Sequence, residues 1–166
     1  MSITLVLLFG VSSVLCTSSS TTSSSSSSPL PCGTPYSSEQ IVDLSFSPNE
    51  KLVFNAPFDM KFMDHFLINH SSWKRVAYKI KVNMSGNSTI LLPKTRGILE
   101  GKDMNAKIPI GFAPFEFDEK NFQNDEISIE WVNIPEDAPI DSNEECFEKW
   151  FEVPARNGTL KIEYNQ

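Results

Sequence analysis

The sequence predicts an all-β fold, an antiparallel β-sandwich of short strands with one short helix near the C-terminus. Three observations support this prediction. Several segments alternate apolar and polar residues with a period of two, the pattern of a strand with one buried and one solvated face. Turn-forming residues separate these segments. No long segment of the domain carries helical apolar spacing, so seven or eight short strands at regular spacing favour a sandwich.

The expected strands begin near Gln40, where the composition changes sharply. In chain order they are 41–46, 51–55, 62–69, 76–83, 90–92, 105–112, 127–131 and 160–164. The third of these is apolar on both faces, which is typical of a central strand. Pro109 falls inside the sixth and has no amide hydrogen to donate to a neighbour. That strand is therefore expected to be an edge strand or to carry a bulge.

One short helix is expected between the last two of these strands. Ser142 and Glu145 have the spacing of a capping box, in which each side chain satisfies a nearby backbone donor. Three apolar side chains then fall on roughly one face of the helix: Cys146, Phe147 and Trp150. We expect this face to pack on the sandwich rather than to bind a ligand.

The chain divides into three parts. Residues 1–16 resemble a secretory signal peptide, since their apolar run is shorter than the roughly 20 residues that span a bilayer. Cleavage after Cys16 fits the small-residue spacing. Residues 17–40 are a Ser/Thr/Pro-rich spacer with almost nothing to bury, so we expect it to be disordered. Residues 41–166 form the folded domain. The alternative is an intracellular domain with a disordered N-terminus.

Further features bear on the secretory interpretation. Four Asn-X-Ser/Thr sequences are candidate N-glycosylation sites in a secreted chain, at Asn69, Asn83, Asn87 and Asn157. Signal removal would leave two cysteines, Cys32 and Cys146. They are a candidate disulfide that ties the spacer to the domain, and two unpaired thiols are the alternative. The Ser/Thr run suits O-glycosylation if secreted and is otherwise a flexible tail.

The residues that usually carry catalysis form no recognisable pattern. The chain has two histidines, His65 and His70, and neither belongs to a His, Cys and carboxylate cluster with metal-ligand spacing. Phosphate-binding loops and nucleophile-elbow motifs are also missing from the sequence. We therefore predict a non-enzymatic domain that uses no cofactor and no metal.

Charge is distributed unevenly along the chain, whose net charge is −7. Residues 51–107 contain ten Lys or Arg and four Asp or Glu, whereas residues 116–163 contain four and fourteen. Such halves could form complementary surfaces that steer head-to-tail association. Alternatively, the sandwich interleaves the two halves so that their charges mix, which we favour slightly. The overall acidity argues against nucleic acid and anionic membranes as partners.

Several segments together resemble the major sperm protein domain family. They are LVFNAPFD at 52–59, INHSS at 68–72, RVAYKIK at 75–81, GIL at 97–99, NDEISIEW at 124–131, KWF at 149–151 and IEYN at 162–165. The resemblance covers the chain from Lys51 to the C-terminus and implies a seven-stranded immunoglobulin-like sandwich, with Pro57 as a candidate cis-proline. It also implies function by protein contact, because members of this family assemble, signal or act as scaffolds.

The resemblance suggests several roles. Major sperm proteins form dimers and filaments in the cytosol and are released as signals. The related VAMP-associated proteins bind acidic FFAT peptides through a basic strand, which makes Arg75, Lys79 and Lys81 the candidate protein-binding residues here. Two differences weaken the peptide role: Val82 and Asn83 replace two threonines, and Glu126 falls where a lysine is expected. An acidic side chain there repels an acidic peptide.

We therefore expect a non-enzymatic assembly or signalling domain whose partners are proteins, with further copies of itself, as a homodimer or larger, among the candidates. A secreted, glycosylated binding module is the alternative, and an acidic-peptide adaptor ranks third. The expected location is the secretory pathway, with the cytoplasm or cytoskeleton as the alternative. We expect no transmembrane anchor. Glycans at Asn83 or Asn87 would hinder the side-by-side packing that filaments need.

Overall fold

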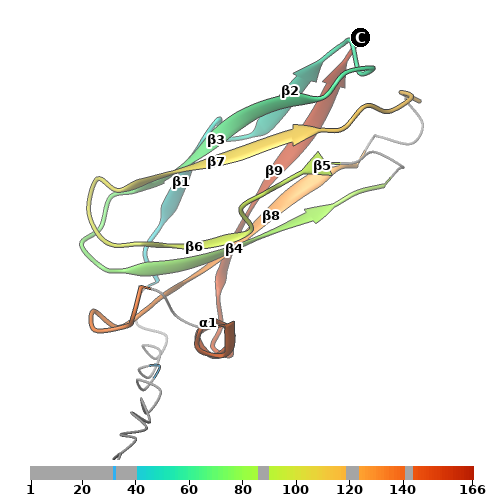
Figure 1. Cartoon of the computed structure of the whole chain (residues 1–166). Coiled ribbons are helices and arrows are strands. Elements are labelled where there is room, and N and C mark those ends of the chain that lie inside the picture. Colours follow the sequence, from blue (N-terminus) through green and yellow to red (C-terminus); the bar gives the residue numbers. More distant parts are fainter. Residues whose placement is uncertain (1–31, 33–40, 86–89, 119–123, 141–143) are drawn as a thin grey trace, which may run out of the picture.

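The computed structural model describes residues 32, 41–85, 90–118, 124–140 and 144–166. Two β-sheets pack face to face, and a short helix lies near one end of the sandwich (Figure 1). The described elements are β1 Leu44–Ser47, β2 Lys51–Asn55, β3 Phe62–His70, β4 Val76–Asn83, β5 Ile90–Leu91, β6 Arg96–Leu99, β7 Asn105–Phe112, β8 Glu126–Asn133, α1 Glu144–Trp150 and β9 Arg156–Asn165. The predicted sandwich and C-terminal helix are confirmed.

The strand count and one strand direction differ from the prediction. Nine strands lie in the described residues rather than seven, in the orders β1-β3-β7-β5 and β2-β9-β8-β4-β6. The pair β2–β9 is parallel, so the sandwich is not wholly antiparallel. The chain leaves the smaller sheet after β1 and enters the larger sheet as β2. Strand β2 lies at the edge of that sheet beside β9 and runs in the same direction as β9. The two strands are far apart in the sequence, so no hairpin connects them.

Two proline predictions are met. The short strand β5 covers β7 only at Gly111 and Phe112, so β7 has an open side at Pro109 within the described residues. This position fits a residue that has no amide hydrogen to donate. The Ala56–Pro57 peptide bond is cis, as the family resemblance implied.

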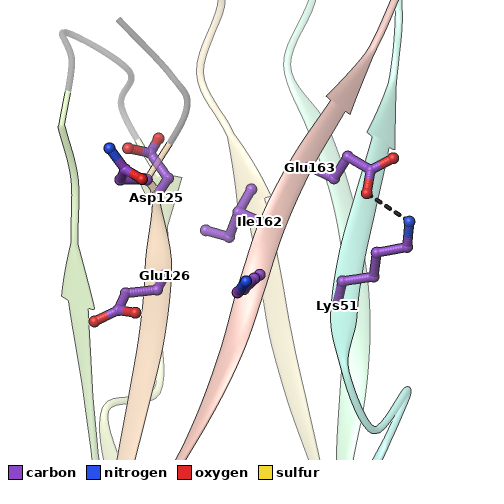
Figure 2. Close-up of a pocket in the computed structure, with 7 residues that line it drawn as sticks. Lys51, Asp125, Glu126, Ile162 and Glu163 are labelled. Atoms are coloured by element: carbon purple, nitrogen blue, oxygen red, sulfur yellow. Dashed lines mark hydrogen bonds and ion pairs between the residues drawn. The ribbon is translucent and has the colours of Figure 1, made fainter.

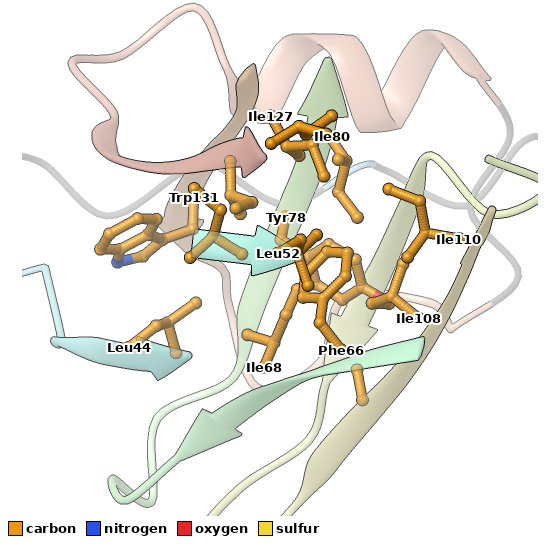
Figure 3. Close-up of a cluster of buried hydrophobic side chains, with 14 of the residues drawn as sticks. Leu44, Leu52, Phe66, Ile68, Tyr78, Ile80, Ile108, Ile110, Ile127 and Trp131 are labelled. Atoms are coloured by element: carbon orange, nitrogen blue, oxygen red, sulfur yellow. The ribbon is translucent and has the colours of Figure 1, made fainter. Parts of the chain in front are cut away.

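The core lies between the sheets and is built from the alternating residues of every long strand. Figure 3 shows these side chains pointing toward one another from opposite sheets. Those with no exposed surface include Phe66, Ile68, Tyr78, Ile108, Ile110, Ile127 and Ile129. Each fully buried aliphatic or aromatic side chain contributes about 1.5–3 kcal/mol, which conformational entropy largely offsets. The predicted period of two therefore identified the core-facing residues of β4, β7, β8 and β9, whereas β3 was predicted to be apolar on both faces.

Helix α1 covers the outer face of the larger sheet. Phe147 and Trp150 pack against Ala77 of β4 and Val132 of β8, which point away from the main core. Cys146 is buried on the same helix. The predicted helix face is thus confirmed, whereas Ser142 lies outside the described residues, so the capping box stays a prediction.

The basic and acidic halves of the chain interleave. Basic β4 lies against acidic β8, and Lys81 Nζ is 2.9 Å from Glu130 Oε1. Lys51 on β2 likewise pairs with an acidic residue of β9, Glu163, at 2.5 Å. Mixing of charges is therefore what the sheet topology produces, rather than two separate faces of opposite sign.

Candidate functional site

A shallow groove lies beside β2, where that strand ends and the chain turns toward β3. Its volume is about 310 Å³. The lining combines apolar residues with one positive and one negative side chain: Val53, Asn55, Ala56, Pro57, Met60, Lys61, Phe62 and Asp64. Met63 is also exposed, but its side chain lies against Gly111 on the other face of β3 and does not line the groove. We call these eight lining residues the β2-edge groove.

The sequence explains why apolar side chains reach solvent in the β2-edge groove. Leu52 and Phe54 alternate inward and are buried, so Val53 between them points outward. Met60 lies in the loop that follows β2 and leaves 63% of its surface exposed. Phe62 stacks on Phe112 with ring centroids 5.6 Å apart, yet nearly half of its surface remains accessible. A contiguous exposed apolar patch is a typical protein-contact site.

The backbone beside the groove is also open on one side. Strand β2 is the edge strand of the larger sheet and pairs with β9 alone among the described strands. The backbone amide of Ala56 extends this pairing by donating to the Asn165 carbonyl at 2.8 Å. An open edge beside an apolar patch offers both backbone hydrogen-bonding groups and apolar surface to another chain.

These groove residues were not among the predicted site residues. Met60 and Phe62 carry most of the exposed surface, but the sequence shows no long apolar run there, since Met60 lies between Asp59 and Lys61 and Phe62 follows Lys61. A usable signal was present in that spacing, because Asp59, Lys61 and Asp64 mark the segment as solvated. An apolar side chain in a solvated segment is therefore expected to stay on the surface.

Arg75, one of the predicted binding residues, is buried within the fold. It is only 8% exposed, because its guanidinium points into the fold. Its Nη1 donates to the carbonyls of Pro135, Glu136 and Ala138 at 3.3, 2.8 and 2.5 Å. Its Nη2 lies 3.1 Å from Glu100 Oε1. Arg75 therefore holds the loop after β8 and has no free face for a partner.

The two predicted lysines lie on the outer face of the larger sheet and are already paired. Lys79 Nζ lies 2.5 Å from Glu148 Oε2 and 4.3 Å from the centre of the Phe151 ring. Its role is to fasten α1 to β4. Lys81 is more exposed and pairs with Glu130. Lys81 is thus the one of the three predicted binding residues that a partner could reach with little rearrangement.

A second, polar hollow lies between β2, β9 and β8. Figure 2 shows Lys51 of β2 paired with Glu163 of β9 on one side, and Asp125 and Glu126 at the start of β8 on the other. Asp125 is buried, and its carboxylate accepts hydrogen bonds from the Ser85 amide, the Ser85 hydroxyl and the Tyr164 hydroxyl at 2.7–2.9 Å. This carboxylate therefore anchors the chain after β4 to β8 and β9.

The predicted modification residues are widely spread. Asn83 and Asn157 are exposed on the larger sheet, Asn69 is half-buried in β3, and Asn87 lies outside the described residues. Cys32 and Cys146 are joined by a disulfide, and Trp150 Nε1 donates to the Cys32 carbonyl at 2.9 Å. Residues 1–31 and 33–40 are not described, so the signal segment and the disordered spacer stay predictions.

Side chains suited to metal binding are dispersed over the described residues. Among the described residues, no three His, Cys, Asp or Glu side chains are grouped to hold a metal ion. Burial raises the pKa of Tyr78 to about 12, but its hydroxyl lies in the core beside Gly97 and not in the groove. Within the part of the chain that the structure describes, no helix has the length and apolar character needed to cross a membrane.

Comparison with known proteins gives consistent matches. The model of the MSP (Major sperm protein) domain matches residues 43–155. Major sperm protein 10/36/56/76 of Caenorhabditis elegans is 33% identical over 123 residues, 74% of this chain and 93% of that protein. Major sperm protein 49 of the same organism is 33% identical over 124 residues, with the same two coverages.

Two solved structures from Caenorhabditis elegans share the fold. The structure of SSP-19, an MSP-domain protein like family member, aligns with a TM-score of 0.52 at 13% identity, over 74% of this chain and 99% of that chain. The structure of WR4, an MSP family member, aligns with a TM-score of 0.50 at 17% identity, over 74% and 95%. At such identities the likeness concerns the fold alone.

Proposed function

Because this chain belongs to the major sperm protein (MSP) domain family, we propose that it works by protein–protein contact, as a non-enzymatic domain that binds a second copy of itself through the β2-edge groove. The observation that carries this proposal is the exposed apolar surface of Val53, Met60 and Phe62 beside an open strand edge. Burying such a patch stabilises association by roughly 25 cal/mol per Å² before the entropic cost of binding.

The groove has the charge pattern that a twofold contact needs. Lys61 and Asp64 line it together and carry opposite charges. In a twofold dimer the same surface meets itself, so that residue i of one copy contacts residue j of the other and the reverse. With a twofold axis at the groove, Lys61 of one copy can face Asp64 of the second copy. This self-complementarity favours a second copy over an unrelated partner.

The outer face of the larger sheet is a weaker candidate for the contact. Three of its lysines, Lys51, Lys79 and Lys81, are paired with glutamates of the same chain. A partner there would have to replace ion pairs that already exist, and exposed pairs of this kind contribute about 0–1 kcal/mol each. Charged residues are also depleted at the centres of protein interfaces.

The test is the molar mass in solution of wild-type protein and two matched methionine variants. Met60→Glu places a carboxylate in the groove, whereas Met104→Glu places one at the opposite end of the smaller sheet, where Met104 is 45% exposed. We expect wild type and Met104→Glu to form dimers or larger species by sedimentation velocity. Met60→Glu should weaken association about tenfold or more, or roughly 1.4 kcal/mol.

The outcome that contradicts self-association is a wild-type protein that stays strictly monomeric at high micromolar concentration. Equal effects of the two glutamate substitutions would instead show that the groove is not the contact. Unchanged thermal unfolding of Met60→Glu serves as the control for folding, because Met60 lies in an exposed loop and has little to lose on substitution.

A secreted binding module is the second candidate, and the Cys32–Cys146 disulfide favours it. Disulfides persist in oxidising compartments and are rare in the cytosol. The signal-like residues 1–16 point in the same direction. Mass analysis of native protein tests this candidate through cleavage after Cys16 and the state of the two remaining cysteines. An uncleaved, fully reduced protein confined to the cytoplasm would favour the cytoskeletal alternative.

An acidic-peptide adaptor is the least favoured role. Lys81 is paired with Glu130, and Glu126 lies directly across from Asn83 in the register of β4 and β8. A peptide rich in carboxylates would meet two acidic side chains at this surface, and repulsion of that kind costs binding energy. Titration with an FFAT-like peptide should therefore give no detectable binding, and micromolar affinity would overturn this ranking.

A further inference from the structure

Two Asn-X-Ser/Thr sequences lie on one surface of the molecule, the outer face of the larger sheet. On β4, Asn83 is separated from Lys79 and Lys81 by an even number of residues, so all three lie on one face of the strand. Asn157 and Lys161 share a face of β9 for the same reason. All of these residues alternate with core residues, so their side chains point outward. Cross-strand pairing connects the two asparagines with β8, since Asn83 pairs with Glu126 and Asn157 pairs with Glu130.

We propose that Asn83 and Asn157 are N-glycosylation sites, and that their glycans cover the outer face of the larger sheet while the β2-edge groove stays uncovered. Both side chains are exposed, as is Thr159, the hydroxyl residue of the second sequence. Exposure is the structural context that an N-glycosylation sequence requires. This proposal stands apart from self-association, because it concerns a different surface and a different chemistry.

The donor is a polyprenyl-pyrophosphate-linked oligosaccharide, the substrate class that supplies N-glycans. The asparagine Nδ2 forms a bond to C1 of the first sugar and loses one proton. The bond between C1 and the pyrophosphate oxygen breaks, and the lipid pyrophosphate leaves with the electron pair. The amide keeps one N–H.

The folded structure accommodates that product at Asn83. Its Nδ2 donates to Glu126 Oε1 at 3.1 Å and to Ser128 Oγ at 3.3 Å. The single N–H of a glycosylated amide can retain one of these two hydrogen bonds. The sugar then extends into solvent from the end of β4, so the modification requires no rearrangement of the core.

The disulfide supplies an independent reason to place this chain where glycans are added. The Cys32–Cys146 bond joins the segment before the domain to α1. Protein disulfides form and persist in the secretory pathway, where N-glycosylation also takes place. The apolar run within residues 1–16 has the length of the segment that directs chains into that pathway.

The position of the two sites decides which surface remains open. Asn83 is three strands from Lys51 on the edge strand β2, or about 14 Å at the usual strand spacing. Asn157 is six residues along β9 from Glu163, which pairs with Val53, or about 20 Å. Glycans at these sites obstruct a partner at Lys81 but leave the β2-edge groove accessible.

The test is site mapping on the full chain expressed in a eukaryotic cell with a secretory pathway. Recovered protein is treated with an amidase that removes N-glycans and converts each occupied asparagine to aspartate. The masses of its peptides are then measured by mass spectrometry. We expect conversion at Asn83 and Asn157. Thr159→Ala keeps Asn157 but should lose the mass of one glycan, whereas the matched variant Thr159→Ser should keep it.

Protein recovered with both asparagines unconverted would overturn the proposal, as would equal glycan mass in the Thr159→Ala and Thr159→Ser variants. Self-association is measured separately on the enzymatically deglycosylated protein. A monomeric but glycosylated chain removes the function proposed above and keeps this inference. A dimeric chain without glycans does the reverse.

Discussion

Arg75 fixes the loop that follows β8, together with the buried side chains of Ile134 and Ala138 in that loop. Its guanidinium binds three carbonyl oxygens of the loop that follows β8, and its backbone carbonyl accepts from the Ile134 amide at 3.0 Å. Sequence alone assigns an arginine to the surface, because arginine is rarely buried. Arg75 is buried because it supplies hydrogen-bond donors to the carbonyls of a loop far away in the sequence. The residues next to Arg75 in the sequence carry no sign of that contact.

Replacing Arg75 should therefore destabilise the protein. We expect Arg75→Met to lower the free energy of unfolding by about 2–4 kcal/mol, since it leaves buried carbonyls without donors. Arg96→Met is the matched control, because the Arg96 side chain is 45% exposed and its pair with Glu144 spans 3.5 Å. It should cost less than about 1 kcal/mol. Urea unfolding measures both, and equal costs would contradict this role.

Gly97 and Tyr78 form a tight contact inside the core. A Cβ atom at Gly97 would overlap the Tyr78 hydroxyl, and the ring carbon Cζ would lie 2.7 Å away. We expect Gly97→Ala to cost about 1–3 kcal/mol, the usual cost of overpacking. In a Tyr78→Phe background the cost should fall without vanishing, because Cζ remains. A double-mutant cycle measures this coupling, and strict additivity would contradict it.

The same tyrosine predicts how stability depends on alkaline pH. Burial raises the pKa of Tyr78 to about 12 from an ordinary value of 10.0, so the folded state holds this proton more tightly than the unfolded chain. Its contribution is complete below the ordinary pKa and is lost as pH rises toward about 12. Unfolding free energies at about pH 9 and about pH 11 should fall less in Tyr78→Phe than in wild type. Parallel losses would contradict this assignment.

At the scale of elements, the sequence predicts most strands because their core-facing residues alternate. Strand β6 was not predicted, since four residues with a glycine among them provide too few alternations to count. The parallel pairing of β2 with β9 could not be predicted either, because residues 51 and 161 meet only after the whole chain has folded. The β2-edge groove has the same origin: its residues come from the end of β2, the following loop and β3.

Helix α1 depends on a covalent connection as well as on packing. The Cys32–Cys146 disulfide spans a sequence separation of 114, and Trp150 supports it through the Cys32 carbonyl. We expect Cys32→Ser to lower the free energy of unfolding by about 2–4 kcal/mol. Wild type should lose similar stability in reductant, whereas Cys32→Ser should not respond to reductant. A wild type that is indifferent to reductant would contradict a structural disulfide.

At the scale of the whole molecule, the sheet order determines which surfaces remain available. Basic and acidic segments lie on neighbouring strands, so their charges are paired on the outer face of the larger sheet. Apolar surface is left at the open edge of that sheet, in the β2-edge groove. Contact through the groove and glycans on the outer face are therefore compatible on one molecule.

The most direct test of this account is hydrogen exchange of the wild-type protein at low and at high concentration. Self-association through the β2-edge groove predicts that added protection of backbone amides is confined to peptides covering residues 51–64, because that segment contains the open edge and the apolar patch. Protection on β4 and β8 instead, or exchange that does not change with concentration, would contradict the central claim that two copies meet at this groove.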